Sequence, residues 1–517
     1  MNHAPILPIL LPMAAAIALL LLPAANRRGV ALVSMLAQLV VAVLLLAMAD
    51  DGTVGVYRLG DWPAPYGIVL VADRLAAMMV AVTTVLGLAA LAHACAGSDR
   101  DGRHFHPLFQ LQLAGLNGAF LTGDLFNLFV FFEILLLASY GLLMHGGGAA
   151  RARAGIAYVV LNLTGSALFL IALGLIYGTL GTLNIADIAV VLAQVPAADQ
   201  ALARTAAALL VAVFLLKAAL LPLSFWLPHV YAAAGAPVAA LFAVMTKVGI
   251  YALLRLETIG LAGAPATVGL LQPWLPVLAL LTIAAGTLGA LAARRLAGVA
   301  ANLVLVSTGT LLAAITVGTP TATAAALYYL PHTTLVTGGL FLLVDHLSRE
   351  RGIKGDTINN GPPLPRALLL GAAFLVLGAA AAGVPPLSGF LGKVMVMQAV
   401  REAPLGGWVW AGLLVSGLVV ALVLARAASA FFWEAAPDEP PAPLAEPSLT
   451  GRRTVAALLL LVAASPILTL AAAPVAAYAR ATADQLHART PYIEAVLGTQ
   501  PDVQRERRPH AQRELGK

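Results

Sequence analysis

Apolar runs of roughly twenty residues recur from Ala4 to Tyr478, and they constrain the fold of this chain more than any other feature. A run of this length is what an α-helix needs to cross the hydrocarbon core of a bilayer. The runs are continuous rather than alternating, and backbone polar groups in lipid must be bonded within the chain, so helices are predicted and a β-barrel is not. With 61% hydrophobic and 10% charged residues, a soluble core is excluded. The sequence predicts an all-α polytopic membrane protein.

Basic residues are divided unevenly between the loops that join the predicted spans, which number about fourteen. If the N-terminus is outside, the outer loops carry only Arg58, Arg204, Arg255 and Arg401. The cytoplasmic loops then carry Arg27, Arg28, Arg100, Arg103, Arg151, Arg153, Arg294, Arg295, Arg349, Arg351, Lys354, Arg366, Arg452 and Arg453. The positive-inside rule therefore predicts a multi-pass membrane protein with both termini on the outer side. The basic pair Arg27–Arg28 follows the first apolar run, whereas a secretory signal has its basic residues before the run. A retained first helix is therefore expected.

Two proline segments repeat one pattern, at Leu221–Leu227 and Pro385–Leu391. Each follows an apolar half-span and precedes another. Proline removes a hydrogen-bond donor and clashes with the preceding turn, so discontinuous helices are predicted at Pro222 and Pro386, with a third interruption at Pro331. Paired broken helices are typical of transporters built from two inverted-topology repeats. Two ordinary proline kinks are the alternative.

The chain is accordingly divided into six segments. They are N-terminal helices 1–3 (1–106), a first repeat with helices 4–8 (107–258), a second repeat with helices 9–13 (273–433), a proline-rich acidic cytoplasmic loop (434–452), helix 14 (453–478) and a polar C-terminal tail (479–517). The tail either docks on a neighbour or is solvated, and its composition favours a solvated tail.

Four charged residues lie inside apolar runs: Glu133, Lys217, Lys247 and Lys393. A lysine at that depth costs at least about 2.5 kcal/mol on insertion scales, so proteins place it where it pairs, titrates or lines a wet path. Lys217 and Lys393 lie within about two helical turns of the two predicted breaks, where freed backbone groups and water are expected. Glu133 and Lys217 form either a static ion pair or a switch, in which movement of the acid makes the amine hold or release a proton.

Three histidines and one acid are further candidates, and the depth of Lys247 in its span also bears on the site. Lys247 lies too far from either end of its span to snorkel to the membrane surface. His332 follows Pro331, and an imidazole suits a relay between lysines, although a lone buried histidine is also typical of a hydrogen-bonded core. The predicted proton relay is Glu133, Lys217, Lys247, His332 and Lys393. His229, Asp345 and His346 lie near span ends as mouths of a proton path or as interfacial residues, and the interfacial interpretation is favoured for His346. Cys95 is the only cysteine and is predicted to fill core space, and no metal or other cofactor is expected.

Four segments around these residues resemble a known family: Leu121–Glu133, Lys217–His229, Ala236–Lys247 and Gly383–Lys393. They are similar to the antiporter-like subunits shared by respiratory complex I and the multisubunit Mrp-type cation/proton antiporters, also called Pha, Sha or Mnh. Within that group, the segments 61–74, 178–187 and 492–498 are most similar to the D-type subunits. The similarity extends from the second span to beyond residue 490.

By this resemblance, Glu133 matches the acid of the fifth helix, Lys217 and Lys247 match the lysines of the broken seventh and the eighth, and His332 and Lys393 match the polar positions of the broken eleventh and twelfth. The resemblance implies a proton-translocating D-type subunit of a sodium or potassium/proton antiporter that contributes to pH and cation homeostasis. It implies a transporter rather than an enzyme, with A-, B-, C-, E-, F- and G-type subunits, monovalent cations, protons and the lipid bilayer as partners, and no nucleic acid.

Other functions follow from the same residues. The alternative within the family is a proton-pumping subunit of a respiratory NADH dehydrogenase or membrane hydrogenase complex, although Lys393 argues against the complex I subunit that has an acid there. A stand-alone solute carrier is another alternative. A membrane enzyme such as a lipid-carrier transferase would need an acidic or His-rich loop, and the loops here are short and plain. The tenth span, 297–317, has no carboxylate to mirror Glu133, which argues against independent cation binding by this chain.

Overall fold

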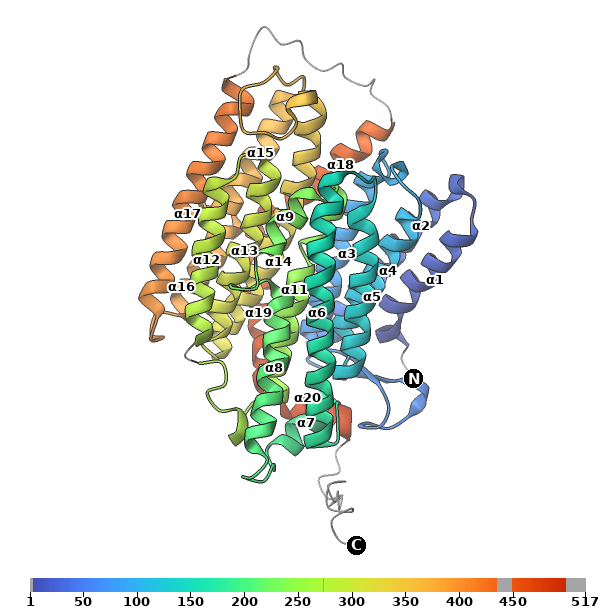
Figure 1. Cartoon of the computed structure of the whole chain (residues 1–517), viewed down its shortest axis with the longest axis vertical. Helices are drawn as coiled ribbons and strands as arrows, with labels where there is room; N and C mark the ends of the chain where they lie inside the picture. Colours follow the sequence, from blue (N-terminus) through green and yellow to red (C-terminus); the bar gives the residue numbers. More distant parts are fainter. Residues whose placement is uncertain (1–2, 273, 435–448, 499–517) are drawn as a thin grey trace.

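The computed structural model describes residues 3–272, 274–434 and 449–498, and the chain in these ranges is a bundle of helices that run along one long axis (Figure 1). Twelve of the described helices are long and apolar enough to cross a membrane. The all-α membrane fold is therefore confirmed. The expected count of about fourteen spans is approximate, because α4 (Phe105–Leu121) and α15 (Ala367–Ala382) are shorter than the other spans. Most of the predicted acidic loop and the end of the tail lie outside the described residues.

The N-terminal part contains a small sheet that the sequence did not predict. Strands β1 (Gly55–Arg58) and β2 (Val69–Ala72) pair antiparallel, with Gly55 opposite Ala72. The helices of this part are η1 (Ala4–Ile6), α1 (Leu7–Leu21), α2 (Ala24–Ala49), η2 (Leu59–Asp61), α3 (Arg74–Ala94) and η3 (Ser98–Arg100). The short hairpin lies in the segment between α2 and α3.

The first half of the bundle continues from α4. Its further helices are α5 (Leu125–Met144), α6 (Ala149–Leu180), α7 (Ile185–Leu192), α8 (Gln200–Ala218), α9 (Trp226–Ala233), α10 (Ala236–Phe242), α11 (Met245–Arg255), η4 (Leu256–Gly260) and η5 (Pro265–Thr267). Asp124 caps α5, because its side chain accepts a hydrogen bond of 2.8 Å from the Asn127 N–H. This cap fixes where the helix that carries Glu133 begins.

The second half comprises α12 (Trp274–Ala292), α13 (Leu296–Ile315), α14 (Pro320–Arg351), η6 (Gly352–Lys354), α15, α16 (Ser388–Ala399), α17 (Gly406–Ala428) and η7 (Ser429–Trp433). The N-terminus of α13 has no cap from its own flanking residue. Asp356, from the loop after η6, instead accepts a hydrogen bond of 2.9 Å from the Ala297 N–H and one of 2.7 Å from Arg295 Nε. Asp356, from a loop distant in sequence, therefore caps the N-terminus of α13, as Asp124 caps that of α5.

Two of the three predicted helix interruptions are present. Helix α8 ends at Ala218 and α9 begins at Trp226, with Pro222 between them, and α15 ends at Ala382 while α16 begins at Ser388, with Pro386 between them. At Pro331 the prediction was wrong, because α14 is one continuous helix through this proline. Its most apolar stretch is completely buried, and packing from all sides holds the helix together despite the missing donor.

The C-terminal helices differ from the expected single span followed by a solvated tail. Helix α18 (Leu449–Leu470) ends before the predicted limit, and α19 (Ala472–His487) and α20 (Thr490–Leu497) follow. Tyr492 is 2% exposed, and its ring lies 5.2 Å from the guanidinium carbon of Arg255. Arg255, expected in an outer loop, is buried and paired with Asp73. The tail therefore packs on its own chain as far as Leu497. Both η1 and α20 contact β1, which places the two ends of the described chain at the same end of the bundle (Figure 1).

Candidate functional site

Glu133 lies on α5 and faces α6. Its Oε1 accepts a hydrogen bond from the Ser166 hydroxyl, and the side chain is only partly buried. A carboxylate held by one hydroxyl has no fixed counter-charge, so it keeps more freedom than a fully paired acid. Glu133, the single acid of the predicted relay, therefore has a neutral hydrogen-bond partner.

Lys217 lies in the last turn of α8, immediately before the break at Pro222, and is 5% exposed. Its Nζ donates to the backbone oxygen and to the side-chain Oδ1 of Asn162, at 3.3 Å each. The ring of Phe132 lies 5.9 Å from the same nitrogen. The static ion pair with Glu133 that was one alternative is not formed, since Lys217 bonds to an amide on α6 instead.

Lys247 lies on α11 and is completely buried. Its Nζ donates to Ser307 Oγ on α13 at 3.0 Å and to the neighbouring Thr246 Oγ1 at 3.3 Å. Ser307 in turn donates to the backbone oxygen of Val304 at 2.8 Å. Lys247 is therefore enclosed by neutral hydroxyls, at the contact between α11 and α13, which belong to different halves of the bundle.

His332 lies on α14 and is 2% exposed. Its Nδ1 lies 2.8 Å from Ser388 Oγ at the start of α16, and Ser388 Oγ lies 2.8 Å from Ser465 Oγ on α18. The imidazole thus begins a short chain of hydroxyls across three helices. Because a hydroxyl both donates and accepts, this chain can pass a proton by rearrangement of its hydrogen bonds.

Lys393 lies on α16 and is 6% exposed. Its Nζ donates to the backbone oxygen of Ala382 at 2.8 Å. Ala382 is the last residue of α15, and Gly383 after it has a φ of 83°, a conformation that glycine adopts without strain. The helix break therefore supplies Lys393 with a carbonyl that has lost its own partner within the helix.

The structure buries the three lysines and His332, but it joins no two of the five relay residues directly within the described ranges. Each bonds to neutral groups instead, and the sequence did not identify these groups: Asn162, Ser166, Ser307, Ser388, Ser465 and the oxygen of Ala382. The side chains among them are ordinary polar residues of apolar helices. The only available signal was their repeated occurrence inside predicted spans.

A second polar group lies toward the predicted cytoplasmic end. Asp345 on α14, left open by the sequence, lies 2.7 Å from Nε2 of the buried His93 and 2.8 Å from Arg349 Nε. It lines a cavity of about 430 Å³ together with Arg151 and other residues. His346 is 3% exposed, and its Nε2 lies 3.3 Å from the backbone oxygen of Thr454 near the start of α18, so its position at the membrane interface stays a prediction. His229 is exposed. The sequence analysis missed His93 altogether.

A helical membrane bundle with buried amines beside two broken helices defines an ion-translocating membrane protein. The chain belongs to the family described as the transmembrane part of NADH:quinone oxidoreductase and the Mrp antiporter, which it matches over residues 122–419.

Relatives match nearly the whole chain. A probable K⁺/H⁺ antiporter D-type subunit of Rhizobium meliloti is 41% identical, with 96% of this chain and 98% of that protein covered. An Na⁺/H⁺ antiporter D-type subunit of Alkalihalophilus pseudofirmus is 34% identical, with 96% and 100% covered.

Solved structures of membrane complexes contain chains with the same fold. A chain of the Mrp complex from Dietzia sp. DQ12-45-1b matches with a TM-score of 0.85 and 27% identity, over 96% of this chain and 100% of that one. A chain of respiratory complex I from Thermus thermophilus matches with a TM-score of 0.78 and 25% identity, over 93% and 99%.

Proposed function

We propose that this chain is the D-type subunit of a multisubunit monovalent cation/proton antiporter and that it translocates protons. The observation that carries this proposal is the set of three enclosed lysines, each bonded to neutral groups, in a chain similar over nearly its whole length to D-type antiporter subunits. An amine without a carboxylate partner can lose its proton at a lower cost than one in an ion pair. The named relatives differ in the cation, K⁺ or Na⁺, so the proposal includes both.

The proposed path runs through Glu133, Lys217, Lys247, His332 and Lys393. Asn162 on α6 accepts from Lys217, Ser307 links Lys247 to α13, and the Ser388–Ser465 pair extends from His332. The two halves that carry this path are proposed to be inverted repeats with the limits 107–258 and 273–433. Loss or gain of a proton at one lysine changes the field at the next, which is how charge movement passes between groups that do not touch.

The proposed location is the cell inner membrane, with the termini on the periplasmic side and A-, B-, C-, E-, F- and G-type subunits as partners. The unequal distribution of arginine between the loops supports this orientation. The position of η1 and α20 at one end of the bundle fits an even number of spans.

The proton-pumping subunit of a respiratory complex is the second candidate, because a complex I chain shares the fold at 25% identity. The two candidates differ in what drives proton movement. Purified with its partner subunits, an antiporter exchanges cations for protons without an electron donor, whereas a respiratory subunit moves protons only during electron transfer.

The experiment that tests the proposal is cation/proton exchange by the whole complex in everted vesicles. Glu133→Gln keeps shape and hydrogen bonding with Ser166 but cannot take part in charge switching, so we expect exchange to be lost while assembly persists. Glu133→Asp is expected to keep part of the activity, and Thr164→Val, on the exposed face of α6, serves as the control. Full exchange by the Gln variant would show that Glu133 is only structural.

A companion measurement uses the chain alone. Because α13 has no carboxylate, the purified single chain in liposomes is expected to give no cation-dependent dissipation of a pH gradient. Activity of the single chain would contradict its role as one subunit of a larger antiporter.

A further inference from the structure

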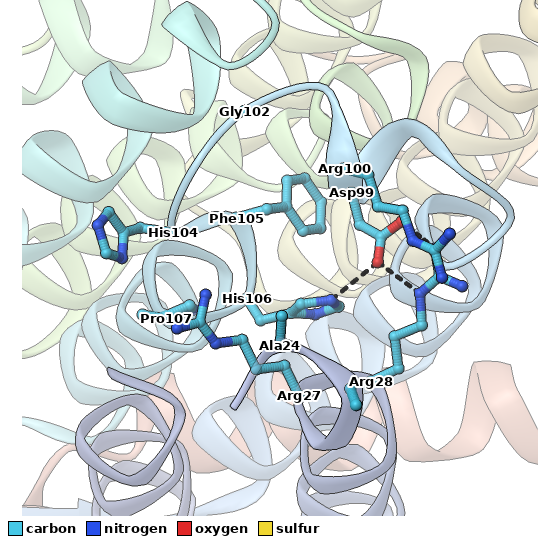
Figure 2. A pocket seen from close by; sticks show the side chains of 11 residues that line it. Ala24, Arg27, Arg28, Asp99, Arg100, Gly102, His104, Phe105, His106 and Pro107 are labelled. Carbon is cyan, nitrogen blue, oxygen red and sulfur yellow. Dashed lines mark hydrogen bonds and ion pairs between the residues drawn. The ribbon is translucent and has the colours of Figure 1, made fainter. Parts of the chain in front are cut away.

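A cationic pocket lies where the start of α2 meets the loop between α3 and α4 and the start of α4 (Figure 2), and none of the five relay residues is in its lining. The cavity has a volume of about 360 Å³. Its lining includes Arg27, Arg28, Arg100, His104 and His106, with Asp99 as the only carboxylate. We refer to it as the arginine pocket.

Asp99 does not neutralise the whole pocket, because both oxygens of its carboxylate already bond to Arg28. Arg28 Nε lies 2.7 Å from Asp99 Oδ2 and an Arg28 Nη lies 2.6 Å from Oδ1, while His106 Nε2 lies 3.0 Å from Oδ2 (Figure 2). Burial opposes the charge of this carboxyl, but the hydrogen bonds from His106 and Arg28 outweigh burial and lower its pKa to about 2. The Asp99 carboxylate is therefore ionised, and both of its oxygens already have hydrogen-bond partners.

Two arginines of the pocket keep an excess positive charge. Arg27 Nε donates to the backbone oxygen of Leu22 at 3.1 Å, which fixes its stem over the helix turn. Arg100 is exposed. Over the part of the chain that the structure describes, neither guanidinium forms an ion pair with a carboxylate. A pocket with this charge and with planar donors selects an anion with several oxygens.

The same cluster is a poor cation site, although ligand atoms of Cys95, Asp99 and His106 lie within 4.8 Å of one another. The Arg28 fork holds both carboxylate oxygens. Burial raises the pKa of the Cys95 thiol to about 11, so the thiolate that a metal needs is disfavoured. The charges at this place favour an anion over a metal ion.

The surface beside the pocket is apolar. On α1, Ile17, Leu20 and Leu21 are 60%, 51% and 82% exposed, and Leu21 ends the helix shortly before α2, whose first turn carries Ala24 and Arg27. A membrane lipid has this combination of parts, with phosphate oxygens at the level of the loops and acyl chains along the helix below. We propose that the arginine pocket binds the phosphate of an anionic phospholipid headgroup.

The test uses the complete complex reconstituted in vesicles of phosphatidylglycerol and phosphatidylcholine, then extracted and washed, with retained lipid counted per complex by native mass spectrometry. The pocket variant is Arg27→Gln with Arg100→Gln. The control variant is Arg294→Gln with Arg452→Gln, which removes the same charge from exposed side chains on the same predicted side of the membrane. A parallel wash contains excess inorganic phosphate.

We expect the pocket variant to retain about tenfold less phosphatidylglycerol than the wild type, because it loses the two arginines of the pocket lining that form no ion pair within the described residues. The control variant is expected to retain the wild-type amount, and Arg100→Gln alone, at an exposed side chain, should fold normally and show a smaller loss. The proposal would be overturned if both double variants lost the same amount of phosphatidylglycerol. It would also be overturned if the wild type retained as much phosphatidylcholine as phosphatidylglycerol. If the wild-type complex retains no more phosphatidylglycerol than the pocket variant in the phosphate-free wash, the lipid is overturned as the source of the phosphate.

Discussion

Lys217 and Lys393 lie at matching helix breaks in the two halves of the bundle, but different groups hold their amines. Lys217 donates to both the side chain and the backbone oxygen of Asn162 on α6, and Glu133 lies on the adjacent α5. Lys393 donates to the backbone oxygen of Ala382 at the break itself, and α13 of this half contains no carboxylate. A side-chain partner can rotate away, whereas a backbone oxygen in a packed helix stays in place. One of the two partners of Lys217 can therefore move, whereas Lys393 is held by the backbone at the helix break.

The geometry of the second half therefore depends on close packing around the break. An added Cβ on Gly389 would clash with the backbone oxygen of Ala380 and would lie 2.8 Å from His332 Nε2. These contacts require α15 or α16 to move, and overpacking of this kind costs typically about 1 to 3 kcal/mol.

The largest expected effect in this comparison is that of Gly389→Ala, for which we predict loss of nearly all cation/proton exchange. His332 and Lys393 both depend on the position of α16. Gly174→Ala on α6 is the matched control, because nothing lies within 4 Å of its added Cβ. The measurement is exchange in everted vesicles at matched complex abundance, and normal exchange by the Gly389 variant would mean that the second half is not rigidly held.

An intermediate effect is expected for Asn162→Leu, which keeps a similar size and removes the side-chain acceptor of Lys217. The backbone oxygen of residue 162 remains as a partner. A hydrogen bond from a charged donor is worth about 1.5 kcal/mol or more, so exchange should fall about tenfold. Vesicle assays under the same conditions check this, and an unchanged rate would remove the contrast between side-chain and backbone partners.

The smallest effect concerns Asp124, which caps the N-terminus of α5. Asp124→Ala should lower the stability of the complex by about 1 kcal/mol, since the side chain of Asp124 caps α5, while exchange by the folded complex persists. Asp124→Asn keeps the cap. Burial raises the pKa of Asp124 to about 6, against backbone hydrogen bonds that lower it.

Because this folded-state pKa lies above the ordinary value of 3.8, Asp124 favours the folded state more as the pH falls from about 7 to 5. Thermal unfolding of the complex over this range should therefore show a gain in wild-type stability relative to Asp124→Ala and to Asp124→Asn, neither of which has a carboxyl at this position. Equal pH dependence in the wild type and both variants would contradict this assignment.

The helix breaks could be predicted from sequence because their cause is local. Pro222 and Pro386 remove donors wherever they lie, and a repeated segment around each one strengthened the prediction. Pro331 has the same local chemistry, yet α14 continues through it, since packing by its neighbours decides the outcome there. The docking of Tyr492 on Arg255 is likewise a contact between segments far apart in sequence.

The ionisable residues of the site could be predicted, but their partners could not. A charge inside an apolar run is conspicuous, whereas Asn162 and Ser307 are ordinary polar residues until the fold brings them to a lysine. The partner of Lys393 is the oxygen of an alanine, which no side-chain pattern reveals. His93 was missed because its pairing with Asp345 joins α3 to α14.

The central claim, that the buried lysines titrate during transport rather than act as fixed charges, is tested most directly by Lys217→Arg and Lys393→Arg. Arginine keeps the positive charge but effectively never deprotonates, so it can bond to the same partners without relaying a proton. The measurement is the proton flux of each variant complex at matched expression from about pH 7 to 9, with the Ala variants alongside. We predict that both Arg variants lose most of the flux, close to the loss in the Ala variants, and that Lys247→Arg is also impaired. Arg variants that match the wild type while the Ala variants are inactive would contradict the relay.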